Sequence, residues 1–204
     1  KMYRVIKVLN NNGILVFDMQ REEEAILLGS GVGFGKRINE RFELKETDAV
    51  KRYAIVGREE KNRTGRQVIG GVEPVYLETA GRIVDAGRQA LGEMNPNILI
   101  PLADHIAFAA KRVKSGVVLD NPLHAAIQIL YPEEYQAALT AREIIREMAD
   151  CLLPETEVGY IALHLRAGRM DEKLEEAFAD NEEWLAVLGE AVYQYQKKTV
   201  RKMI

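Results

Sequence analysis

The stretch at residues 5–37 constrains the fold more than any other part of the chain, because short β-branched runs alternate there with turn residues. Residues 5–9 alternate in the manner of a strand. The run Asn10–Gly13 ends this strand, since Asn and Gly tolerate positive φ and favour a tight turn between two strands. Further strands are expected at residues 13–17, 25–28 and 41–44. The pattern does not assign a secondary structure to residues 47–56. The pattern predicts a small four-stranded antiparallel sheet.

Four glycines then alternate with other residues at positions 29, 31, 33 and 35, followed by Lys36 and Arg37. This spacing indicates backbone that bends sharply or approaches another group closely. Two nucleotide-binding motifs are excluded. The P-loop needs Gly at position 30 and a hydroxyl at 37, and the dinucleotide fingerprint needs Gly where Phe34 stands.

Composition places the chain among ordinary globular proteins, with 47% hydrophobic and 29% charged residues. The lone Cys151 cannot form an internal disulfide, and no apolar run approaches the roughly 18 residues of a membrane span. We therefore expect a cytoplasmic protein without membrane insertion. Residues 1–70 carry 14 Lys/Arg against 10 Asp/Glu, and the remainder carries 14 against 21. A slightly basic head on an acidic body is compatible with a nucleic-acid module or with a solvated surface.

From residue 72 onward the periodicity becomes helical. Five helices are expected at residues 75–91, 97–115, 122–130, 132–151 and 154–168. The fold class is therefore α+β by domains, with a β-rich head at residues 1–57, a polar linker at 58–71 and a helical bundle at 72–169. Residues 170–204 indicate either a helical tail or the start of a second, truncated regulation domain.

Two separate segments resemble one known family. KVLNNN at residues 7–12, followed by GSGVGFGKR at 29–37, resembles the RNA-binding domain of the bacterial BglG/SacY/LicT antiterminators, and the glucose-operon branch looks closest. The segments at residues 102–112, 121–135 and 152–165 resemble the regulation domain that follows it in the same family. The resemblance implies a homodimeric CAT-type RNA-binding domain and a PTS regulation domain. It implies an antiterminator that stabilises a leader-mRNA hairpin, without DNA as a partner.

The resemblance also implies residue roles. Lys7, Asn12, Gly29, Gly31 and Phe34 match family positions at the RNA surface. Lys on phosphate, Asn on base edges or 2′-hydroxyls, and Phe on an unpaired base are physically suitable contacts. From the residues alone, the asparagines could serve turn chemistry only and Phe34 could be a core aromatic.

Ser30 departs from the family, which commonly has Arg or Lys at this position. Loss of that cation should weaken the attraction to phosphate and make affinity less dependent on salt. Lys36 or Arg37 is the candidate to compensate.

The three histidines are His105, His124 and His164. Taken alone, each is more often a structural side chain than a functional one. The resemblance instead implies that His105 and His164 are phosphorylated by the sugar phosphotransferase system, through a sugar permease (enzyme II) or HPr. We expect His105 at the rim of its helix, supported by Asp104, and His124 in a structural role.

No catalytic triad and no metal spacing is found in the sequence, so neither enzyme activity nor a metal or other cofactor is expected. The alternative function is a phospho-histidine signalling or phosphocarrier protein whose β head only dimerises.

Overall fold

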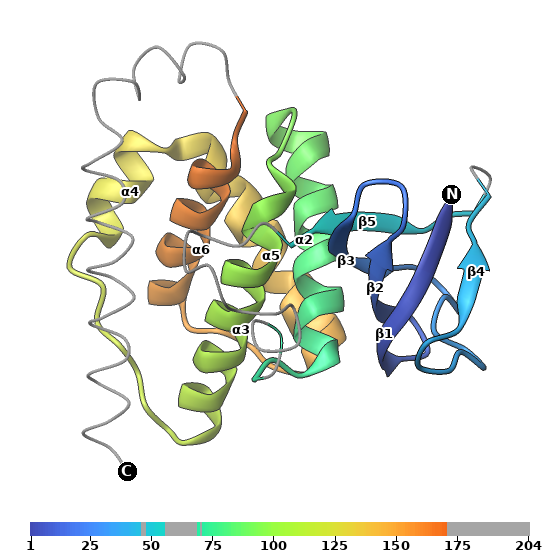
Figure 1. Ribbon diagram of the computed structural model, residues 1–204. Coiled ribbons are helices and arrows are strands. Elements are labelled where there is room, and N and C mark those ends of the chain that lie inside the picture. Colours follow the sequence, from blue (N-terminus) through green and yellow to red (C-terminus); the bar gives the residue numbers. More distant parts are fainter. Residues whose placement is uncertain (46–47, 56–68, 70, 171–204) are drawn as a thin grey trace. The chain divides into compact units, whose positions relative to one another are not determined.

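The head of the molecule is an antiparallel sheet. The structure is a computed structural model that describes residues 1–45, 48–55, 69 and 71–170, and Figure 1 shows its elements. The strands are β1 (Met2–Asn10), β2 (Gly13–Asp18), β3 (Glu23–Leu28), β4 (Arg41–Glu43) and β5 (Lys51–Ala54). Their order in the sheet is β4-β1-β2-β3-β5. The sequence predicted four strands, and the structure adds a fifth. This strand, β5, lies in a stretch without clear alternation and pairs with β3.

Both faces of this sheet are apolar, which follows from the alternation of side chains along each strand. Ile14 and Val16 of β2 join one cluster, which the loops of the head cover with Val32 and other apolar side chains. Leu15 lies on the opposite face, with Ile26 and Leu28 of β3. A strand with large apolar residues on both faces must be covered on both sides. The second face is therefore covered by something other than the head's own loops.

Among the residues that the structure describes, the body has five α-helices and one short 3₁₀ turn, and all five expected helices are confirmed within a few residues. They are α2 (Pro74–Leu91), η1 (Pro96–Ile98), α3 (Leu99–Lys114), α4 (His124–Leu130), α5 (Pro132–Ala149) and α6 (Glu155–Gly168). Proline stands in the first turn of α2 and α5, where its missing N–H costs nothing. Most of the expected linker at 58–71 and the tail beyond residue 170 lie outside the described residues.

Helix α2 covers the second face of the sheet. Its buried Leu77, Ala80 and Val84 belong to the same core cluster as Leu15 and Ile26. Residues 1–169 form one compact unit, so the sheet and the helices share a continuous core. Gly81 of α2 allows close contact, because a Cβ there would lie 2.9 Å from Cδ1 of Leu28. The second apolar face of the sheet is thus in contact with this chain's own helix.

Candidate functional site

The two head motifs come together in space, although 16 residues lie between them in sequence. The β1–β2 turn accepts hydrogen bonds from the glycine-rich loop. The N–H of Gly29 donates to the carbonyl oxygen of Asn12 at 2.9 Å, and the N–H of Gly33 donates to that of Asn11 at 2.9 Å. A third bond runs from the N–H of Gly31 to Oδ1 of Asn12 at 3.1 Å. The turn and the loop therefore form one surface, which we call the head loop surface (residues 10–12 and 29–36).

Glycine is required within this surface for two reasons. A Cβ on Gly33 would lie only 2.0 Å from the carbonyl oxygen of Asn10, which no side chain can tolerate. Gly31 and Gly35 have φ angles of 72° and 68°, a region that L side chains rarely adopt. The expectation of sharply bent, closely approaching backbone is thus confirmed.

Several of the residues expected to bind RNA are exposed on or beside this surface. Phe34 is 73% exposed, so its interpretation as a core aromatic is wrong. Lys7 and Ser30 are exposed as well. An exposed aromatic ring beside bare backbone offers a platform on which a base can stack.

Lys36 is engaged within the head. Its Nζ lies 2.9 Å from Oε1 of Glu40 and 4.5 Å from the ring centre of Phe42. The neighbouring Arg37 is exposed. Of the two candidates to compensate for Ser30, Arg37 is therefore the better placed to meet a phosphate.

The asparagine side chains are held in one orientation. Oδ1 of Asn10 accepts the backbone N–H of Asn12 at 2.9 Å, and Oδ1 of Asn12 accepts the N–H of Gly31. Because each oxygen has a backbone donor, each NH₂ group points away from the turn. Both NH₂ groups donate to the carboxylate of Glu78 on α2, from Nδ2 of Asn12 at 3.2 Å. The asparagine oxygens thus stabilise the turn, while the NH₂ groups donate to a partner outside it.

The second site lies among the helices, where His105, Arg112 and Glu157 are buried and His164 is half-buried. His105 of α3 and His164 of α6 face each other with ring centres 5.1 Å apart. Nε2 of His105 lies 3.3 Å from Oε2 of Glu157, also on α6. Arg112, two turns beyond His105 on α3, donates to Oε1 of Glu157 from Nη2 at 2.6 Å and from Nε at 3.2 Å. One carboxylate thus joins the histidine and the guanidinium.

The charges of this histidine pocket (His105, Arg112, Glu157 and His164) depend on one another. Burial alone would raise the pKa of Glu157, but the contacts with His105 and Arg112 outweigh burial and hold that pKa below its usual value. Burial and the nearby His105 lower the pKa of His164 to about 3, so this ring is neutral at physiological pH. A neutral imidazole is the form that can act as a nucleophile.

His105 is not at the helix rim as expected. Its side chain is buried, because α6 packs over that edge of α3 and covers it with Glu157. The sequence contained a signal for Arg112, which lies seven residues after His105 and so on the same helical face. Asp104 is half-buried, and its supporting role stays a prediction. His124 contacts the hydroxyl of Tyr135 at 3.2 Å, which suits the structural role expected for it.

Comparison with known proteins follows the same two-part division. Residues 3–62 match the model of the CAT RNA binding domain, and residues 84–168 match that of the PRD domain. The crystal structure of GlcT CAT-PRDI is 32% identical, with a TM-score of 0.68, and the match covers 84% of this chain and 100% of that one. The chain belongs to the BglG/SacY/LicT family of transcriptional antiterminators.

Three relatives with similar sequences are named as antiterminators. The GlcA/glcB genes antiterminator of Staphylococcus carnosus is 31% identical over 88% of this chain and 62% of that protein. The PtsGHI operon antiterminator of Bacillus subtilis is 32% identical over 85% and 61%. The Beta-glucoside operon antiterminator of Dickeya chrysanthemi is 30% identical over 94% and 66%. The chain thus spans about three fifths to two thirds of the length of these antiterminators.

Proposed function

We propose that this chain is a sequence-specific RNA-binding antiterminator. The observation that carries the proposal is the head loop surface, where two separate motifs form one exposed patch. That patch carries the asparagine NH₂ groups, which donate to Glu78 in this structure, together with an exposed Phe34 and backbone held open by glycine. The names of the relatives favour RNA binding over the phosphocarrier alternative.

The physical properties of RNA define what such a surface can recognise. Base edges of A-form RNA lie in a deep, narrow groove that side chains cannot enter, so proteins read the shallow groove, loops and bulges. Phe34 would stack on an unpaired base, while Lys7 would contact phosphate. Asn12 would donate to a base acceptor or a ribose oxygen. Binding of a leader-mRNA hairpin in this way would prevent a competing terminator hairpin from forming.

The histidine pocket would supply the regulation. Phosphorylation of His105 or His164 by proteins of the sugar phosphotransferase system, a permease or HPr, would add about −1.5 to −2 charges, by analogy with other phosphorylated side chains. At Nε2 of His105 that charge would stand beside the Glu157 carboxylate, which lies 3.3 Å away. Repulsion between the two would disrupt the contact between α3 and α6. The packing of the body would thereby be biased between two states.

Other parts of the proposal follow the family. The chain would act as a homodimer in the cytoplasm, with the head at residues 1–57 and the regulation domain at 72–169. Within the described part of the chain, no helix has both the length and the apolar character needed to cross a bilayer.

Selection from a pool of randomised RNA hairpins tests the RNA-binding function. The binding is carried out at two salt concentrations with duplex DNA as competitor. Recovery of one hairpin family with paired bulges at both concentrations is the expected result. Recovery of nothing, or of sequences that are lost at the higher salt, would leave only phosphate attraction and overturn the proposal.

Variants locate the site. Lys7→Ala combined with Asn12→Ala should abolish binding of the selected hairpin while thermal unfolding of the helical body is unchanged. Lys45→Ala combined with Gln20→Ala removes the same two kinds of group from exposed positions elsewhere in the head and should have little effect. Equal RNA affinity in both double variants would show that the head loop surface is not the binding site.

A further inference from the structure

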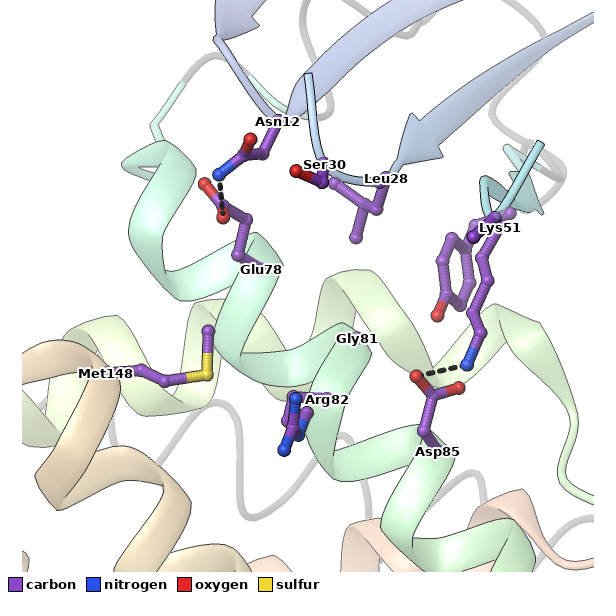
Figure 2. Close-up of a pocket in the computed structure, with 12 residues that line it drawn as sticks. Asn12, Leu28, Ser30, Lys51, Glu78, Gly81, Arg82, Asp85 and Met148 are labelled. Atoms are coloured by element: carbon purple, nitrogen blue, oxygen red, sulfur yellow. Dashed lines mark hydrogen bonds and ion pairs between the residues drawn. The ribbon is translucent and has the colours of Figure 1, made fainter. Parts of the chain in front are cut away.

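Helix α2 presents a regular pattern of residues to the head. Glu78, Gly81 and Asp85 are spaced by three and four residues, so they lie along one face of the helix. The Glu78 carboxylate accepts hydrogen bonds from Asn10 and Asn12. The side chain of Leu28 packs against Gly81, and Asp85 forms an ion pair with Lys51 of β5. Figure 2 shows two of these contacts along α2, with Asn12 directed at Glu78 and Lys51 at Asp85. The head is therefore attached at two charged points with a close apolar contact between them.

The Glu78 contact occupies groups that the proposed function assigns to RNA. Both asparagine oxygens are held by backbone N–H groups, so the two NH₂ groups are the donors that remain for a ligand. In this structure both donate to one carboxylate. A carboxylate resembles a phosphate group in its charge and in its paired acceptor oxygens. Glu78 thus takes the place of an RNA acceptor and brings a negative charge to the surface that RNA phosphates would approach.

We propose that Glu78 is an autoinhibitory residue, whose carboxylate competes with RNA for the NH₂ groups of Asn10 and Asn12. This inference rests on the proposed RNA-binding function and adds a closed state to it. RNA and the docked α2 cannot both use the two NH₂ groups. The apparent affinity for RNA is therefore reduced by the fraction of molecules in which Glu78 is bound.

The charge-neutral variant Glu78→Gln tests this competition in the whole chain. It keeps the side chain's size but removes the charge that strengthens its hydrogen bonds. Affinity for the hairpin recovered by selection should rise about tenfold, which corresponds to a shift of the closed fraction from roughly nine tenths to almost none. Glu93→Gln removes the same charge from an exposed position just after α2 and should leave affinity within about twofold.

A second measurement needs no RNA. The side-chain amide resonances of Asn10 and Asn12 in an NMR spectrum should shift in Glu78→Gln and stay in place in Glu93→Gln. Unchanged resonances in Glu78→Gln would overturn the inference, because the contact would be absent in solution. Shifted resonances with unchanged RNA affinity would also overturn it, while leaving RNA binding itself established. If no protein, variant or wild type, retains a hairpin, the proposed function fails and the competition fails with it.

Discussion

The head loop surface and the histidine pocket are organised in opposite ways. In the head, backbone hydrogen bonds fix the turn and the loop, and side chains such as Phe34 point outward. In the body, Glu157 and Arg112 are buried together, and their side chains hold His105. The first arrangement is a preformed surface whose exposed Phe34 a large ligand can reach, although Glu78 holds its asparagine NH₂ groups. The second covers His105 and its carboxylate and leaves His164 half-buried, so it is suited to switching rather than to constant binding.

The largest expected change in stability comes from removing the buried carboxylate of the histidine pocket. Glu157→Ala leaves the Arg112 guanidinium buried without its carboxylate, which should lower the free energy of unfolding by about 3–5 kcal/mol. Glu157→Gln keeps an acceptor for Arg112 and should cost less. The measurement is urea denaturation at pH 7.

An exposed ion pair gives the matched control. Glu143→Ala removes the partner of Arg146, which lies at 2.8 Å on the surface of α5, and should cost under about 1 kcal/mol. A loss in Glu157→Ala no larger than that in Glu143→Ala would mean that the buried pair does not hold the pocket.

The next effect tests the backbone organisation of the head. Gly33→Ala places a Cβ against the carbonyl oxygen of Asn10, so the loop must move away from the β1–β2 turn. A loss of about 2–3 kcal/mol in the free energy of unfolding is expected, together with loss of hairpin binding. Gly71→Ala is the control, because a Cβ there meets nothing within 4 Å. If both alanine variants behave as wild type, the two head motifs are not joined as described.

A smaller effect separates binding from stability in the head. Phe34→Ala should weaken hairpin binding by about 1–3 kcal/mol, the usual contribution of one base–aromatic stack. Its effect on the free energy of unfolding should stay within about 0.5 kcal/mol, because the ring is mostly exposed. Met19→Ala changes an exposed side chain just after the last residue of β2, away from the head loop surface, and should change neither quantity. Filter binding and thermal unfolding of the same samples distinguish the two readouts, and a Phe34→Ala variant that unfolds early but binds normally would contradict the assignment.

The smallest effect is a pH dependence in the pocket. His164 has a pKa of about 3 in the folded chain and about 6.5 when unfolded. The unfolded state therefore binds more protons between these values, so stability is full above pH 6.5 and decreases as the pH falls toward 3. Between pH 7 and pH 6 the loss should be under about 1 kcal/mol.

Variants identify the group responsible. His164→Gln should flatten this part of the stability profile, measured by urea denaturation at several pH values, whereas His124→Gln should retain the slope. A profile that keeps its full slope in His164→Gln would assign the titration to another group.

Much of the local structure was predictable from the sequence. Asn–Gly turn chemistry located the β1–β2 hairpin, and the helical periodicity with its prolines and glycines located all five helices of the body. The fifth strand was missed, because residues 51–54 have no clear alternation and depend on pairing with β3. The burial of His105 was also missed, since helical spacing shows which face a residue shares but not which helix will cover it.

Residues that are close along the chain specified four of the five strands, the turns, the helices and the family resemblance. Only the tertiary structure decided that Glu78 meets Asn12 across 66 residues and that Glu157 joins His105 to Arg112. Such contacts depend on which apolar faces pack together, and many different pairs of surface charges would satisfy the same local patterns. Packing of α2 on the sheet and of α6 on α3 selects among them, because burial forces each charged group to find a partner.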